Sequence, residues 1–160
     1  MHWPQSSRPL PRGFQVNAYK HILAAIDLNE EASEVLNNVR NLARLYDARW
    51  SVVSVIRPLT YGYTGIETAA LGHVVLNFEM EAQVMARKRL AELCAEVPED
   101  RRHVLIGSPA VEVRACAKAI GADLIVIGSH GQHGLGLILG STANGVLHGS
   151  PCDVLTIRIK

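Results

Sequence analysis

Long apolar runs are missing from this chain. No stretch of its 160 residues approaches the about 18 consecutive apolar residues that a membrane-spanning helix needs. The first 17 residues, "MHWPQSSRPLPRGFQVN", also lack the apolar core of a signal peptide, so we expect a flexible tail. Both absences predict a cytoplasmic protein that has no membrane partner.

An excess of one charge sign is also missing. Lys and Arg total 16 against 15 for Asp and Glu, which leaves a formal net charge of +1 without a block of like charges. A long-range electrostatic field that would attract nucleic acid or an anionic membrane is therefore absent. Any anionic ligand would have to be held by local contacts.

Cysteine is scarce, and its spacing excludes the common metal and redox motifs. Cys94, Cys116 and Cys152 are far apart and form no C-x-x-C pair, which is typical of reduced cytosolic thiols. His130 and His133 form an H-x-x-H pattern inside a glycine-rich stretch that offers no further ligands. We therefore expect no metal site in the protein itself.

Short apolar runs alternate with helical patterns from residue 21 onward. The runs have the length and the β-branched composition of buried strands, and they cover residues 21–28, 49–58, 102–107, 123–128 and 152–159. We expect residues 59–71 to form a loop. Strands that alternate with helices predict an α/β fold, a mostly parallel sheet covered on both faces.

Helices are predicted between these runs. Apolar residues three or four apart mark one helix around 35–46 and a long amphipathic helix over about 72–96, whose apolar positions are Val75, Phe78, Ala82, Ala86, Leu90, Leu93 and Val97. Ser108 and Pro109 begin a third helix that Gly121 ends, and a short helix follows at 141–149.

Glycine is concentrated in one place. The stretch "GSHGQHGLGLILGST", residues 128–142, holds five of the thirteen glycines. Placed after a strand, it could turn successive backbone N–H groups toward phosphate oxygens, and Ser141 and Thr142 could add hydroxyl donors. Asp27, at the end of the first strand, would reach the same sheet edge and accept hydrogen bonds from a base or a ribose. Alternatively, the glycines serve only turns and close packing, and Asp27 is an exposed carboxylate or a helix cap.

Known catalytic and nucleotide-binding motifs do not fit this stretch. No lysine occurs from 119 to 159, which excludes a Walker loop, and the glycines at 134, 136 and 140 are spaced one residue too far apart for a dinucleotide fingerprint. Neither Ser129 nor Ser141 lies in a G-x-S-x-G elbow, and His148 is interpreted as a helix-end residue. No lysine or arginine is placed to stabilise a transferring phosphoryl group, so slow ATP hydrolysis is the weakest hypothesis.

The two ends of the domain resemble one known family. "GSHGQHGLGLILGS" followed by "VLHGSPCDVLTIR" is similar to the closing segment of universal stress protein domains, and "AYKHILAAIDL" resembles their first strand, particularly that of the universal stress protein A branch. The resemblance covers residues 18–160. It implies one domain with an open, parallel, five-stranded sheet, a Rossmann-like fold of the adenine nucleotide alpha-hydrolase type. It also implies a homodimeric, non-enzymatic stress-response regulator.

The resemblance further implies a ligand, ATP or another adenine nucleotide, which Mg²⁺ could accompany. Gly128, Gly131, Gly140 and Ser141 match the phosphate-and-ribose motif, and Thr142 follows them. Asp27 matches the acidic residue near the adenine, Val55 matches the apolar contact to the base, and Ala25 lies at the same edge.

One departure keeps a second hypothesis open. Eight residues separate Gly131 from Gly140, where the nucleotide-binding pattern has nine. Removing one residue can displace backbone donors by up to about 3.5 Å, more than a hydrogen bond tolerates. The alternative is a nucleotide-free dimeric interaction protein whose cleft is blocked by Leu135, Leu137 or Ile138. In both hypotheses the last strand, 152–159, forms the dimer, because an apolar edge strand is normally covered or paired.

Overall fold

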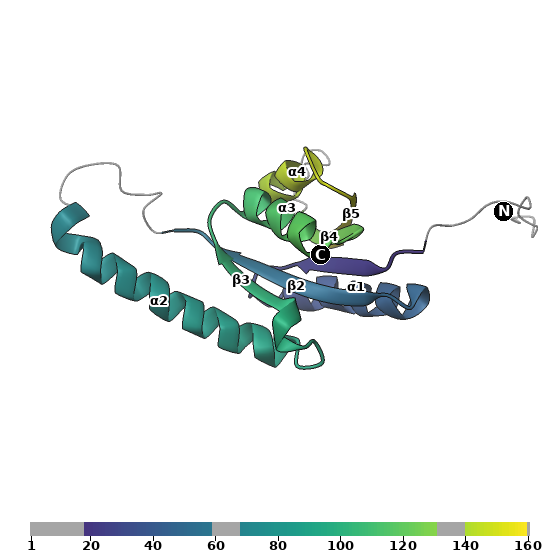
Figure 1. Cartoon of the computed structure of the whole chain (residues 1–160), viewed down its shortest axis with the longest axis horizontal. Helices are drawn as coiled ribbons and strands as arrows, with labels where there is room; N and C mark the ends of the chain where they lie inside the picture. Colours follow the sequence, from purple (N-terminus) through teal and green to yellow (C-terminus); the bar gives the residue numbers. More distant parts are fainter. Residues whose placement is uncertain (1–17, 59–67, 131–139, 160) are drawn as a thin grey trace, which may run out of the picture.

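The predicted α/β fold is confirmed. The computed structural model describes residues 18–58, 68–130 and 140–159 (Figure 1). Within these residues, four α-helices connect five parallel strands in the order β3-β2-β1-β4-β5. The elements are β1 (His21–Ala25), α1 (Ala32–Tyr46), β2 (Arg49–Ile56), α2 (Thr68–Leu93), a 3-10 turn (Glu99–Arg101), β3 (Arg102–Ile106), α3 (Pro109–Ile120), β4 (Leu124–His130), α4 (Ser141–Leu147) and β5 (Asp153–Ile159).

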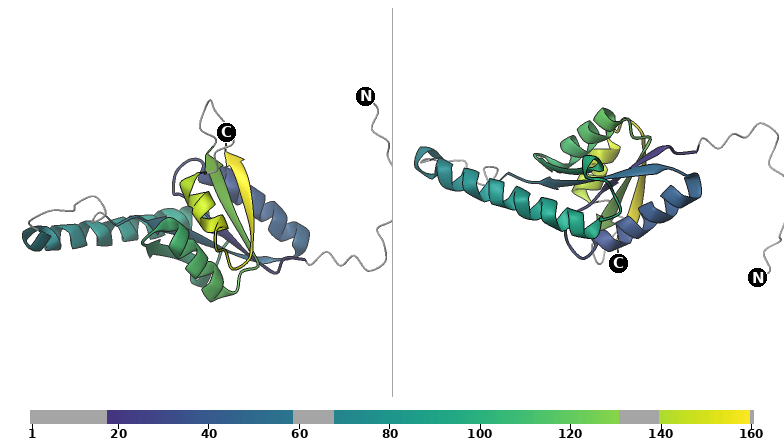
Figure 2. Two further views of the ribbon diagram at one scale, coloured as in Figure 1. Left: turned by 90° about the horizontal axis from the view of Figure 1, so that it is seen from above. Right: turned by 60° about the horizontal axis from the view of Figure 1, so that its bottom comes forward.

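The central strand β1 is buried on both faces, which explains its uninterrupted apolar sequence. Ile22 and Ala24 contribute to the core under α1 and α2, whereas Leu23 and Ala25 contribute to the core under α3 and α4. This alternation follows from the two-residue period of a strand. The sheet is thus the middle layer of three, with two helices on each side (Figure 2).

The strand order fixes where a ligand could bind. Strand β1 is in the centre of the sheet. The chain adds β2 and then β3 along one edge of β1, and it adds β4 and then β5 along the other edge. The direction of winding therefore changes between β1 and β4. In open α/β sheets such a point leaves a crevice beyond the carboxyl ends of the strands.

Two elements begin or end at other residues than predicted. Strand β1 ends at Ala25, so Ile26, Asp27 and Leu28 form the turn into α1. Helix α2 begins at Thr68, within the segment predicted as a loop, and ends at Leu93. The predicted start and end of α3 are confirmed, since Ser108 is its N-cap and Gly121 ends it with φ +65°.

Only the C-terminal half of α2 packs as its apolar spacing predicts. Ala86 and Leu90 are buried, but Phe78 is 60% exposed and Ala82 is also exposed. The N-terminal half extends beyond the sheet, away from the other elements (Figures 1 and 2). Among the described helices, none is both long enough and apolar enough to cross a membrane.

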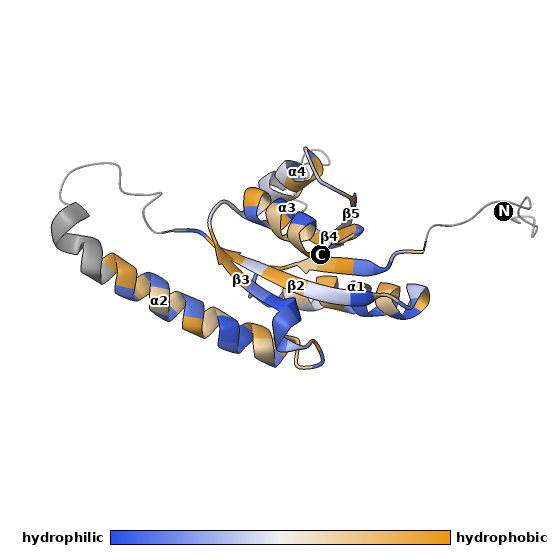
Figure 3. Ribbon diagram, viewed as in Figure 1, coloured by the Kyte–Doolittle hydropathy of each residue, from blue (hydrophilic) through white to orange (hydrophobic). Residues whose placement is uncertain are grey.

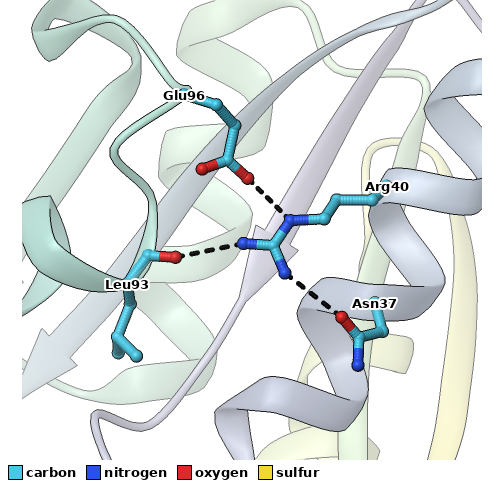
Figure 4. Close-up of polar contacts among 4 residues, drawn as sticks. All are labelled: Asn37, Arg40, Leu93 and Glu96. Atoms are coloured by element: carbon cyan, nitrogen blue, oxygen red, sulfur yellow. Dashed lines mark hydrogen bonds and ion pairs between the residues drawn. The ribbon is translucent and has the colours of Figure 1, made fainter.

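One arginine connects α1 to the end of α2. Arg40 Nε donates to Glu96 Oε1 at 2.6 Å, Nη2 donates to the carbonyl of Leu93 at 3.1 Å, and Nη1 donates to Asn37 Oδ1 at 3.2 Å (Figure 4). Burial opposes ionisation of Glu96, but the hydrogen bond from Arg40, a hydrogen bond to the Glu96 backbone and the charge of Arg40 outweigh it and lower the pKa of the Glu96 carboxyl. The guanidinium therefore satisfies a terminal carbonyl of α2 and fixes the helix against α1.

Candidate functional site

A cleft of about 300 Å³ opens at the carboxyl ends of β1, β2 and β4. It lies at the change of winding direction described above, and α4 begins at its rim. Its volume is at the lower end of the roughly 300–1,000 Å³ typical of small-molecule sites. Seven of the eight predicted site residues line it: Ala25, Asp27, Val55, Gly128, Gly140, Ser141 and Thr142.

The first side of the cleft combines apolar walls with one carboxylate. Ala25 ends β1, Val55 lies near the end of β2, and Asp27 follows two residues after β1. A hydrogen bond of 3.0 Å from the Ile26 N–H to the Val53 carbonyl holds the chain beside β2 beyond the end of β1. Asp27 is the next residue, and it is exposed at the rim, where its oxygens are available to a ligand.

The polar turn that follows adds further acceptors and donors. The Glu31 N–H donates to Asn29 Oδ1 at 3.0 Å, and Asn29 Nδ2 donates to Glu31 Oε2 at 3.2 Å. Both residues line the cleft. This side therefore carries two carboxylates, Asp27 and Glu31, and favours neutral or donor groups of a ligand over its phosphates.

The glycine side differs from the prediction in one respect. Gly128 lies within β4, which continues to His130, so this strand ends two residues later than predicted. A Cβ atom on Gly128 would overlap the end of the Ile159 side chain and lie 3.3 Å from Val35 Cγ2. A larger residue here would therefore require the Ile159 side chain to shift, whether or not a ligand approaches.

The start of α4 supplies the hydroxyl groups. Gly140 is its N-cap, and Ser141 and Thr142 are its first two residues. A Cβ atom on Gly145 would lie only 2.8 Å from Cβ of Ala110, so this glycine lets α4 pack closely on α3. Gly131, the remaining predicted site residue, lies outside the described residues, as do Leu135, Leu137 and Ile138, which the nucleotide-free alternative places in the cleft.

Sequence reasoning missed one basic residue at the cleft. It placed no lysine or arginine near a transferring phosphoryl group, yet Arg57 lines the cleft. Arg57 also lines an adjoining hollow of about 340 Å³, which shares Ser141 and Thr142 with the first. The sequence could have indicated this position, because Arg57 directly follows β2 and all strands of a parallel sheet end at the ligand-binding edge.

Metal-binding and thiol chemistry find little support among the described residues. Within them, no three His, Cys, Asp or Glu side chains are close enough together to hold a metal ion. His133 is outside the described part of the chain. All three cysteines are free thiols, and burial raises the pKa of both Cys94 and Cys116 to about 11, so neither is an activated nucleophile.

Two polar residues have structural contacts instead of catalytic ones. The Ser129 hydroxyl donates to the Ile157 carbonyl at 3.4 Å across the β4–β5 pair. His148 Nδ1 is 2.9 Å from the Asn144 carbonyl at the end of α4, and the His148 carbonyl accepts from Arg114. The interpretation of His148 as a helix-end residue is confirmed.

Known proteins share both the sequence and the fold. The profile of the universal stress protein family matches residues 18–158. Universal stress protein A homolog 1 of Coxiella burnetii is 41% identical over 144 residues, which span 89% of this chain and 98% of that protein. The solved structure of the hypothetical protein MJ0577 has a TM-score of 0.72 at 24% identity, over 89% of this chain and 98% of that one.

A second solved structure, a universal stress protein in complex with cAMP, has a TM-score of 0.55 at 19% identity. It covers 88% of this chain and 98% of its own. At these identities the two structures support the fold, whereas the family profile and the sequence relatives establish the family. The chain belongs to the universal stress protein family, as its two terminal segments predicted.

Proposed function

We propose that this protein binds ATP or a related adenine nucleotide in the cleft and acts as a stress-response regulator. Family membership supports the stress-response role. The observation that carries the nucleotide proposal is the convergence of seven predicted residues on one cleft, although they come from β1, β2, β4, α4 and the segments beside them.

The chemistry of the two sides assigns an orientation to the nucleotide. The base lies against Val55 and Ala25, which offer apolar contact, while Asp27 accepts hydrogen bonds from an amino or ribose hydroxyl group. The phosphates lie at the opposite side, near the Ser141 and Thr142 hydroxyls and the Arg57 guanidinium. The adjoining hollow gives a longer phosphate chain room to extend.

One of the structurally similar universal stress proteins was solved in complex with cAMP, an adenine nucleotide, which supports this choice of ligand. Mg²⁺ would be carried by the phosphates of ATP. We assign a regulatory role because the cleft shows no paired general base and nucleophile among its described residues.

We further propose that the protein is a cytoplasmic homodimer that pairs through β5. This strand is an edge of the sheet, with β4 on one side. Leu155 on β5 is 37% exposed, so the edge offers both unpaired backbone groups and an apolar side chain to a second copy. The free cysteines are consistent with a reducing compartment.

Calorimetric titration tests the nucleotide proposal. ATP, AMP and cAMP should bind with one site per chain and raise the melting temperature, while GTP serves as the control for base recognition. Asp27→Asn should weaken binding without unfolding the protein, because Asp27 is exposed. Absence of heat and of any thermal shift with all three adenine nucleotides would contradict the proposal.

That outcome would favour the nucleotide-free interaction protein. Two observations support this second candidate: the spacer between Gly131 and Gly140 is eight residues long, and Gly128 has a packing contact with Ile159 that needs no ligand. A structure with Leu135, Leu137 or Ile138 inside the cleft would identify it.

A further inference from the structure

The middle of α2 carries large apolar side chains that the rest of the protein does not cover. Leu76, Met80 and Val84 are 57%, 65% and 67% exposed. They occur every fourth residue and so form one stripe along the helix, which we call the α2 stripe. Figure 3 shows apolar bands on the part of α2 that extends beyond the sheet. A helix surface of this kind is usually covered by another element.

Acidic residues come first along this part of α2 and basic residues follow: Glu79 and Glu81, then Arg87, Lys88 and Arg89. Glu81 and Lys88 are seven residues apart, so they lie on the same flank of the helix, about 20° apart around its axis. Both side chains are exposed, and neither has an ion-pair partner among the described residues. Two copies of α2 in parallel would place Glu81 against Glu81. Two antiparallel copies related by a two-fold axis near Val84 would place Glu81 of each helix opposite Lys88 of the other.

The same two-fold axis suits the apolar residues. It brings Val84 of the two copies together. It also places Leu76 of one helix near Ala91 of the other, because Leu76 lies eight residues before Val84 and Ala91 lies seven residues after it. Ala91 is a small, partly exposed residue, so it can accommodate a leucine side chain. The stripe residues are exposed, and the N-terminal part of α2 extends beyond the sheet, so this face of the helix is open to a second helix (Figures 1 and 2).

We propose that the α2 stripe is a self-association surface that pairs antiparallel with α2 of a second copy of this chain, with Glu81 and Lys88 forming reciprocal ion pairs. The contact is separate from β5, since α2 packs on β2 and β3 and β5 is the opposite edge of the sheet. It would therefore join monomers, or join dimers formed through β5, into a larger assembly. Two helices bury a small area, so we expect weak, concentration-dependent association.

Sedimentation velocity over a range of protein concentrations tests the proposal by charge exchange. Glu81→Lys and Lys88→Glu should each abolish the largest assembly, and the double variant should restore it, because the ion pairs re-form with reversed sign. Lys118→Glu is the matched control, since Lys118 is an exposed lysine on α3, on the other face of the sheet. Circular dichroism verifies that each variant is folded.

Cross-linking tests the position of the two-fold axis. Val84→Cys should form a disulfide-linked dimer on mild oxidation, whereas Leu45→Cys, on the exposed side of α1 and 74% exposed, should not. Three results would overturn the proposal: an assembly size unaffected by both single reversals, a double variant no better than the single ones, or equal cross-linking at 45 and 84. Loss of nucleotide binding or of the β5 dimer would leave these outcomes unchanged.

Discussion

Gly128 on β4 packs against Ile159 on β5 so closely that a single added carbon would overlap the terminal methyl group of the isoleucine. Both residues line the cleft. The first glycine of the predicted phosphate-binding motif is therefore also a packing residue, and its effect on stability can be separated from its effect on ligand binding.

Gly128→Ala should destabilise the protein by about 1 kcal/mol, the low end of the cost of overpacking, because the overlapped atom is the end of a side chain that lines the cleft and can shift. The cost should fall when Ile159→Val removes the methyl group that the new Cβ would overlap, although the contact with Val35 remains. Urea denaturation of the wild type, the two single variants and the double variant measures this coupling. Equal destabilisation in both backgrounds would show that the alanine is accommodated elsewhere.

Arg57→Gln should reduce affinity for ATP by about tenfold or more, as expected for loss of a hydrogen bond to a charged group worth roughly 1.5–3 kcal/mol. Adenosine, which has no phosphate, should bind equally well to both proteins. Isothermal titration of the two ligands into the wild type and the variant gives the comparison. A parallel loss for adenosine would mean that Arg57 supports the shape of the cleft instead of contacting phosphate.

Acid should destabilise the protein through His21. Nδ1 of this buried histidine donates to the Ile120 carbonyl at 3.1 Å, so in the neutral ring Nε2 accepts from the Ser51 hydroxyl at 2.8 Å. Burial, followed by the nearby charge of Arg49, lowers the pKa of His21 from its ordinary value of 6.5. The unfolded chain thus binds a proton more readily, and the contribution of His21 is complete above pH 6.5 and is lost as the pH falls toward the lowered pKa.

The pH dependence is measured as the free energy of unfolding between pH 8 and pH 5. In the affected window the wild type should lose up to about 1.4 kcal/mol per pH unit relative to His21→Asn, which carries no titrating ring. Burial also lowers the pKa of His103, but the effect of His103 on the pH dependence is the same in the wild type and in His21→Asn. Identical pH profiles would contradict the assignment to His21.

Arg40→Lys should destabilise the attachment of α2 to α1 by roughly 1 kcal/mol, even though the charge is kept. A lysine cannot reproduce the three directions in which Arg40 donates, to Glu96, Leu93 and Asn37. Arg44→Lys is the matched control on the same helix, since the Arg44 side chain has no hydrogen bond or ion pair among the described residues. Hydrogen exchange near Leu93 should accelerate in Arg40→Lys only, and equal exchange rates would reject this role.

The strands and the cleft could be predicted because both follow from local chemistry. Buried parallel strands are short apolar runs, and Asp27, Val55 and Ser141 were placed by their positions at strand ends and helix starts. Tertiary packing decided the rest. The apolar spacing of α2 predicts a buried face but cannot show that the sheet ends before the helix does, so Phe78 was misassigned.

Arg57 was missed for a related reason. A single arginine after a strand belongs to no recognisable motif. Arg57 reaches the cleft because β2 lies beside β1 in the sheet, which the sequence alone does not show. Likewise, the close packing at Gly128 depends on the side chain of Ile159, which is 31 residues later in the chain.

Photolabelling tests the central claim most directly, because it reports both binding and place. After irradiation with 8-azido-ATP, peptide mass spectrometry should find the label on segments 25–31 or 53–57, around Asp27 and Val55, and unlabelled ATP should prevent the labelling. No saturable labelling, or saturable labelling confined to segments away from the cleft, would contradict an adenine-nucleotide site between β1, β2 and β4.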